Sequence, residues 1–156
     1  MQRKIDKFEM YRTGCEFSDC ADFCINLDNV QKYNAKVITP AIVNAAFACE
    51  VFLKLLLHIH NTSYKKNHKL KGLFELLPEN LKIKIKFECL KKYGELKNCF
   101  GIEYLDNISD AFNKWRYNYE CDWLQSRVMK IETGFLFVFK DVLKEQFKDC
   151  YFYGVI

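Results

Sequence analysis

The sequence predicts an all-α protein, a single bundle of about five helices, and three observations support this. Only six Gly and two Pro occur among 156 residues, so little turn chemistry is present for a fold of many strands. Long segments rich in Leu, Lys and Glu favour helices. The segment from Thr39 to Asn61 is apolar on nearly every side, which is typical of a helix at the centre of a bundle.

The length suits one domain with a full core, and the composition of 50% apolar and 28% charged residues argues against a disordered chain. We expect a charged lead-in over residues 1–14, a helical bundle over residues 15–150 and a tail over residues 151–156.

Neither secretion nor a membrane span is expected. The lead-in contains no apolar signal-peptide core. The central segment is long enough to span a bilayer, but Asn44, Glu50 and Lys54 interrupt it, and a charge in mid-bilayer is costly.

The eight cysteines do not show the spacing of metal ligands. Cys15, Cys20 and Cys24 are five and four residues apart, no CxxC pair occurs, and no His lies near them. Three other cysteines lie inside apolar segments, where a free thiol packs as a small hydrophobe. We therefore expect free thiols in a reducing cytoplasm, no metal and no cofactor, with Cys15, Cys20, Cys24 and Cys121 as packing residues.

The first helix is expected from Glu16 to about Ala35. Its buried face is expected to carry Phe17, Ala21, Cys24 and Leu27. Thr39 is a good N-cap and Pro40 suits the first helical position, so the central helix should begin there and end near His60–Asn61.

A third, short helix is expected from His68, with Asn67 as its cap and Pro78 ending it. Its apolar residues recur at i, i+3, i+4 and i+7, and they are Leu70, Leu73, Phe74 and Leu77.

Residues 81–87 alternate apolar residues with lysines, which is the period of a strand. They also follow Pro78-Glu79-Asn80, which suits a helix start, and they lead into a helical pattern. We expect helix here, with a short edge strand as the alternative. Two further helices are expected over residues 101–123 and 124–148, and the second includes a Phe-rich run with strand propensity.

The positive charge is concentrated in one segment. Residues 63–97 hold ten Lys and four acids, a net of +6, so the rest of the chain is near −2 within a total of +4. Such a segment either meets phosphates or forms a solvated face of snorkelling lysines.

The central helix carries a polar stripe on an otherwise apolar surface. Glu50, Lys54 and His58 are four residues apart and so share one face. A stripe of this kind is either a structural network that fixes helix register or part of a functional site. The structural network could extend to Arg116.

Three segments together resemble the HEPN domain family of helical proteins. The family's long central helix is similar to the segment that begins at Pro40, PAIVNAAFACEVFLKLLL. The His-x-Leu-x-x-Leu-Phe segment that follows that helix in the family is similar to the segment that begins at His68, HKLKGLFELLP. ISDAFNKWRYNYE from Ile108 resembles an Arg-Tyr-containing helix end in the same relative place. The resemblance covers about residues 15–150, and it implies a bundle of about five helices that is often dimeric.

Many HEPN proteins are metal-independent ribonucleases that use an Arg and a His four to six residues apart. The His moves a proton and the Arg stabilises charge at the phosphorus centre. That pair is missing here, because no His follows Arg116 at this distance and all three histidines lie between His58 and His68. The resemblance therefore implies a HEPN-like protein that is non-catalytic.

The function expected from the resemblance is binding of RNA or nucleotide phosphates in a defence, toxin–antitoxin or stress setting. A homodimer and an antitoxin-like protein are the expected partners. One alternative is a scaffold bundle for protein interactions with no nucleic-acid role, and another is a divergent metal-independent ribonuclease. The candidate phosphate-binding residues, chosen because lysines, arginine and aromatic side chains suit phosphates and bases, are Arg116, Tyr119, His68, Lys65, Lys66 and Lys69.

Overall fold

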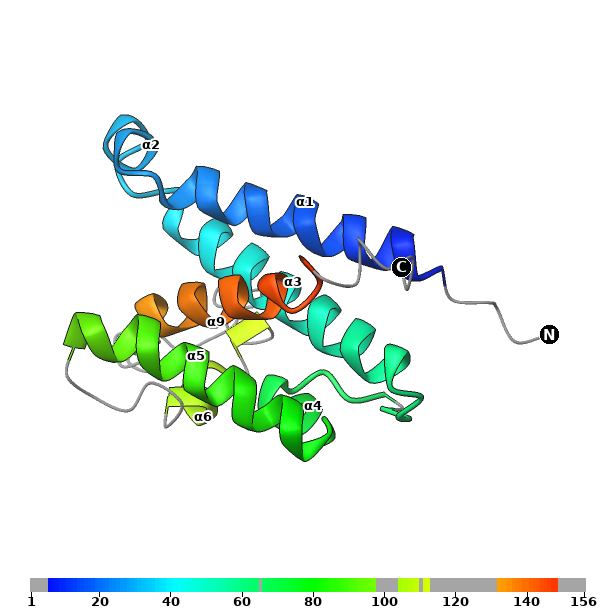
Figure 1. Ribbon diagram of the computed structural model, residues 1–156. Coiled ribbons are helices and arrows are strands. Elements are labelled where there is room, and N and C mark those ends of the chain that lie inside the picture. Colours follow the sequence, from blue (N-terminus) through cyan, green and yellow to red (C-terminus); the bar gives the residue numbers. More distant parts are fainter. Residues whose placement is uncertain (1–5, 65, 98–103, 110, 113–131, 149–156) are drawn as a thin grey trace.

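The computed structural model describes residues 6–64, 66–97, 104–109, 111–112 and 132–148. Within these residues the chain forms seven helices and no strand, so the predicted all-α fold is confirmed. The helices shown in Figure 1 are α1 (Lys7–Ile25), α2 (Leu27–Lys32), α3 (Ile38–Ile59), α4 (Leu70–Glu75), α5 (Glu79–Lys97), α6 (Leu105–Ile108) and α9 (Thr133–Glu145).

The central helix of the bundle is α3, with thirteen buried residues. It packs against α1, α9 and α4, and α9 in turn packs against α5 (Figure 1). By length and composition alone α3 is apolar enough to cross a membrane, and 67% of its apolar window is buried inside the bundle. Burial to this extent is what a core helix shows.

The first helix begins at Lys7, earlier than the predicted start near Glu16. Asp6 caps it, since its side chain accepts a hydrogen bond from the backbone N–H of Glu9 at 3.1 Å. The helix therefore includes residues 7–14, which the sequence had assigned to the lead-in.

The predicted end of this helix near Ala35 is also wrong. The helix stops at Ile25 because Asn26 leaves the helical conformation, and its side chain caps α2 by accepting from the N–H of Asp28 at 3.0 Å. This break turns Leu27 outward, where it is 75% exposed, so its predicted core position is wrong. On the predicted buried face Ala21 is fully buried, whereas Phe17 and Cys24 are partly buried.

The start of α3 differs slightly from the prediction and its end agrees. Val37 is the N-cap and Thr39 lies inside the first turn, so Thr39 is not the cap. Pro40 also lies in that turn, where a missing N–H costs nothing. At the other end Asn61 has a positive φ of 54° and its N–H bonds the carbonyl of His58. The N–H of Thr62 bonds the carbonyl of Leu57, which completes a Schellman motif.

Helix α4 begins at Leu70, two residues after the predicted start. The predicted cap is wrong, because Lys69 and not Asn67 is the N-cap, although the side chain of Asn67 accepts from the N–H of Lys69 at 3.0 Å. The helix also ends at Glu75, three residues before Pro78. All four residues of the predicted apolar face are buried, namely Leu70, Leu73, Phe74 and Leu77.

Residues 81–87 are helical, as part of α5, and the edge-strand alternative is wrong. The N–H groups of Leu81 and Lys82 both bond the carbonyl of Pro78, which confirms the predicted helix start. The Phe-rich run 135–139 is also helical, inside α9. The predicted helices over 101–123 and 124–148 are described only at residues 104–109, 111–112 and 132–148, and their remaining parts lie outside the described residues.

Candidate functional site

The polar stripe of α3 is the centre of the candidate site. Glu50 is 3% exposed, and its Oε1 accepts from Lys54 Nζ at 2.7 Å and contacts His68 Nδ1 at 2.8 Å. Its other oxygen, Oε2, is buried and has no hydrogen-bond partner among the described residues. No hydrogen bond joins His58, the third member of the predicted stripe, to this group within the described part of the chain.

The loop after α3 brings His68 to Glu50, which lies 18 positions earlier in the sequence. The Schellman motif at Asn61 reverses the chain, and the ring of Tyr64 then lies 5.8 Å from Lys54 Nζ. Beyond His68, the N–H of Leu70 donates to the carbonyl of Ser109 at 3.1 Å.

Contacts with α6 hold the start of α4. The N–H of Lys71 donates to Ser109 Oγ at 3.1 Å, and Lys71 Nζ lies 2.6 Å from Asp106 Oδ1. The hydrogen bond that Lys71 donates to the Asp106 carboxylate raises the pKa of Lys71. His68 is therefore positioned by hydrogen bonds on both sides of it in the sequence.

The contact with Glu50 fixes the tautomer of His68. A carboxylate only accepts hydrogen bonds, so Nδ1 must carry a proton to approach it at 2.8 Å. In that neutral tautomer Nε2 carries a lone pair, so it can accept a hydrogen bond from an N–H or O–H group of a ligand, and the side chain is 55% exposed. Lys54 Nζ, 3.5 Å from Nδ1, cannot donate to a nitrogen that already carries a proton.

Two candidate lysines flank His68 in the sequence and are exposed, Lys66 and Lys69. Lys66 has no ion pair with any acid among the described residues. The structure thus brings together Glu50, Lys54 and His68. Lys65, Arg116 and Tyr119 lie outside the described residues, so their predicted roles stay predictions.

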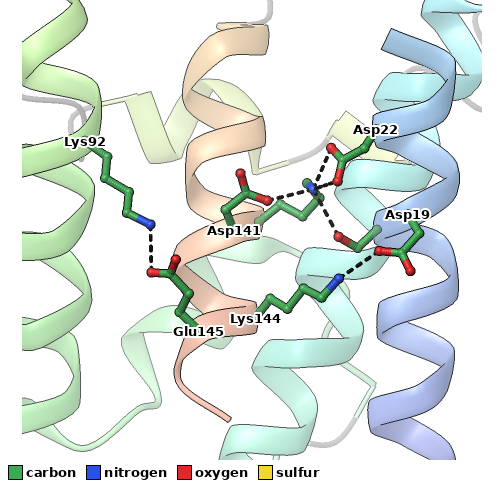
Figure 2. Close-up of polar contacts among 8 residues, drawn as sticks. Asp19, Asp22, Lys92, Asp141, Lys144 and Glu145 are labelled. Atoms are coloured by element: carbon green, nitrogen blue, oxygen red, sulfur yellow. Dashed lines mark hydrogen bonds and ion pairs between the residues drawn. The ribbon is translucent and has the colours of Figure 1, made fainter. Parts of the chain in front are cut away.

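A second polar cluster, between α1 and α9, was missed by the sequence reasoning (Figure 2). The side chain of Lys140 is 0% exposed, and its ammonium group lies 3.0 Å from Ser18 Oγ, 2.8 Å from Asp22 and 2.8 Å from Asp141. A three-donor ammonium group is saturated by these three partners.

A signal for this lysine was present in the sequence. Lys140 lies four residues after Leu136 and three before Leu143, so it falls on the apolar face of its helix. A lysine on such a face has to find an acidic partner, although the pattern does not say which one.

A pocket of about 290 Å³ adjoins this cluster. Its lining residues are Tyr11, Lys92, Asp141, Lys144, Glu145 and Lys148. Each lysine already has an acidic partner. Lys92 pairs with Glu145 and Lys144 pairs with Asp19 (Figure 2), and Lys148 also pairs with Glu145. The pocket is therefore neutralised internally, and we assign it a structural role.

The described cysteines, Cys15, Cys20, Cys24, Cys49 and Cys89, are all free. Cys49 and Cys89 are buried, as expected of packing residues, whereas Cys20 is exposed and its sulfur accepts from Asn44 Nδ2 at 3.3 Å. Cys20 is thus not a core residue, contrary to the prediction. Within the described residues no group of three or more possible ligands is arranged to hold a metal ion.

Comparison of the chain with protein-family models, with curated proteins and with solved structures finds no match. The resemblance to HEPN proteins therefore rests on the three sequence segments given above.

Proposed function

We propose that the protein is a HEPN-like helical bundle that binds RNA or nucleotide phosphates at the surface around His68. The observation that supports this best is the contact between His68 and the buried carboxylate of Glu50. It holds Nδ1 and leaves Nε2 to accept from a ribose hydroxyl or a base N–H, beside the exposed lysines Lys66 and Lys69, which suit the phosphates.

The charges around His68 favour an anionic ligand. Lys54 offsets the buried carboxylate of Glu50, so Lys66, which has no ion pair among the described residues, adds positive charge at the surface. Phosphate groups of a single strand match such a patch and release counterions when they bind. Arg116 and Tyr119 complete the proposal as a phosphate contact and a stacking platform.

The proposal does not include catalysis, because the Arg and His spacing of the ribonucleases is absent. It includes a homodimer and a defence, toxin–antitoxin or stress setting with an antitoxin-like partner, and both come from the family resemblance.

Fluorescence anisotropy of a labelled single-stranded RNA tests the proposal. We expect binding at about 50 mM salt that weakens steeply toward about 300 mM. Lys66→Gln should reduce the slope of log affinity against log salt by about 1, and His68→Ala should weaken binding further. Lys36→Gln removes an exposed lysine elsewhere and should change neither.

Failure to bind RNA at low salt, by a folded protein, would contradict the proposal and favour the scaffold alternative. Ribonuclease activity has a separate test, incubation with a mixed RNA pool in EDTA. Cleavage by the wild type that disappears in Arg116→Ala would show a divergent ribonuclease instead.

A further inference from the structure

Helix α5 carries apolar side chains on two separate faces. Ile85, Cys89 and Tyr93 are four residues apart, and their exposed fractions of 0%, 0% and 1% show that they form the face packed on the bundle. Ile83 and Phe87 are also four residues apart, yet they are 59% and 66% exposed. An outward apolar pair of this size is unusual on a helix that already has a buried face.

The alternating sequence of residues 81–87 explains the second face. Each residue turns a helix by about 100°, so residues with a period of two spread around it and do not share one face. Ile85 thus points into the core and its neighbours Ile83 and Phe87 emerge on the other side. Leu90, three residues after Phe87 and partly buried, continues this outer stripe.

Lysines border the outer stripe of Ile83, Phe87 and Leu90. By helical spacing Lys84 and Lys91 lie along one edge and Lys86 along the other. All three are exposed, and none forms an ion pair within the described part of the chain.

The lysines of α5 that lie closer to the bundle behave differently. Lys82 pairs with Glu79 at 2.7 Å, and Lys92 pairs with Glu145 at 2.7 Å. Among the α5 lysines whose side chains the structure describes, the unpaired ones thus lie beside the exposed apolar stripe.

We propose that this outer stripe, with Lys84, Lys86 and Lys91, is a docking surface for an acidic amphipathic helix of another protein. An apolar stripe at i, i+4 and i+7 packs against a matching stripe of a second helix, and acids at that helix's edges would pair with the lysines. The surface is separate from the His68 site and goes beyond the proposed function.

The chemistry of the stripe favours this occupant over three others. Pairing with α5 of a second copy would bring lysines against lysines. RNA would use the lysines and could stack on Phe87, but Ile83 and Leu90 have no ring to offer a base. A helix that binds a membrane surface needs a broad apolar face, and the broad apolar face of α5 is buried in the bundle.

A display selection with the full chain as bait tests the proposal. The library holds helical peptides with a fixed apolar stripe and edge positions randomised among Asp, Glu, Lys, Arg, Ser and Gln. We expect Asp and Glu to be enriched at the edges. The selected peptides should bind at least about tenfold more weakly to Ile83→Ser/Phe87→Ser, because exposed apolar anchors are lost. Phe23→Ser/Leu27→Ser removes two other exposed apolar side chains and should leave binding unchanged.

A charge reversal gives a second readout that does not depend on the apolar residues. Lys84→Glu/Lys86→Glu/Lys91→Glu should shift the edge positions from acids to Lys and Arg. Circular dichroism and the thermal midpoint should stay near the wild-type values in every variant, since the altered side chains are exposed.

Edge positions that stay at input frequencies, or equal enrichment on the Ile83→Ser/Phe87→Ser variant, would overturn the proposal. Anionic vesicles and poly(U) RNA serve as parallel probes. If no peptide is selected and the vesicles bind in a way that requires Ile83 and Phe87, the stripe is a membrane-binding surface. If poly(U) RNA binds in that way instead, the stripe is an RNA-binding surface. His68→Ala should leave peptide binding intact, which separates this result from the test of the proposed function.

Discussion

The ammonium group of Lys140 lies 2.8 Å from each carboxylate oxygen of Asp22, a residue 118 positions earlier in the chain. The lysine side chain is 0% exposed, whereas that of Asp22 is 51% exposed. This ion pair joins α9 to α1. The buried positive charge of Lys140 is therefore neutralised by carboxylates that are partly exposed to solvent. Removal of the lysine and removal of the acids should therefore lower the free energy of unfolding by different amounts.

Removing the acids should destabilise the fold more than removing the lysine. Asp22→Asn/Asp141→Asn leaves a buried ammonium group without a counter-charge, and we expect a loss of about 3–5 kcal/mol of unfolding free energy. Lys140→Met leaves two half-exposed carboxylates that water can solvate, together with Ser18, which loses a partner, so we expect about 1–2 kcal/mol. Urea unfolding measures both. A larger loss for Lys140→Met would show that the pair is not organised around the buried cation.

Gly14→Ala should destabilise the packing of α1 on α3. A Cβ atom at Gly14 would lie 2.5 Å from Cε1 of Phe52. The ring of Phe52 is fully buried and has the rings of Tyr11 and Phe147 near it, so it cannot move aside freely. Overpacking of about 1–3 kcal/mol outweighs the gain of up to about 1 kcal/mol from replacing Gly in a helix.

Gly134→Ala is the matched control for this substitution. Gly134 is exposed near the start of α9, and its added Cβ would meet Tyr93 at 3.3 Å. This contact is longer than the 2.5 Å contact at Gly14 and asks Tyr93 to shift by only a few tenths of an ångström, so the variant should lose less unfolding free energy than Gly14→Ala does. In a double-mutant cycle, Phe52→Leu should cost less unfolding free energy in the Gly14→Ala background than in the wild type, because it removes the ring that the added Cβ meets. Strict additivity of the two losses would argue against the clash.

Contacts within one helix could be predicted from the sequence, because helical spacing determines them. The Glu50–Lys54 pair and the buried face of α4 follow from residues three and four apart. The contact of His68 with Glu50 could not be predicted, since it depends on the chain reversal at Asn61.

Helix caps and contacts between distant residues also could not be predicted from the sequence pattern. Asp6 starts α1 inside a segment whose charge suggested a lead-in, and Asn26 ends it within a helical pattern. The partner of Lys140 lies on the first helix, and only the packing of α1 beside α9 reveals it. In α5, the period of two was compatible with a strand, and the helix instead spreads its apolar residues over two faces.

Acid should weaken the contact between α5 and α9 through Glu145. Burial raises the pKa of this carboxyl group, but Lys92 and Lys148 outweigh it, so the pKa lies below its usual 4.5. A lowered folded pKa gives stability that is present above about pH 4.5 and lost as the pH falls further. The effect should be small because the side chain is 34% exposed.

Unfolding free energies at pH 5 and pH 3 for the wild type and Glu145→Gln measure this contribution. The wild type should lose more stability on acidification than the variant does. Asp28→Asn alters an exposed acid without an ion pair in the described residues and should match the wild type in its pH dependence. Parallel curves for all three proteins would show that the Glu145 pairs do not contribute.

Alkaline conditions should destabilise the core through its two buried thiols. Burial raises the pKa of Cys89 from its usual 9.0 to about 12, and burial also raises that of Cys49. A raised folded pKa means that stability is fully present below pH 9 and is lost as the pH rises toward 12, because the unfolded chain ionises first. Each such thiol contributes a loss on the order of 1 kcal/mol per pH unit in that window.

Urea unfolding under reducing conditions at pH 8, 9 and 10 checks this expectation. Cys89→Ala should be less stable than the wild type at pH 8, because it leaves a small cavity, yet lose less stability between pH 9 and pH 10. Cys20→Ala removes an exposed thiol that, after burial, helps to raise the pKa of Cys24, so it should change the slope far less than Cys89→Ala does. Thiol labelling at pH 8 should modify Cys20 rapidly and reach Cys89 only when the core opens. If Cys89 were labelled as fast as Cys20, α5 would have to open far more readily than its buried face allows.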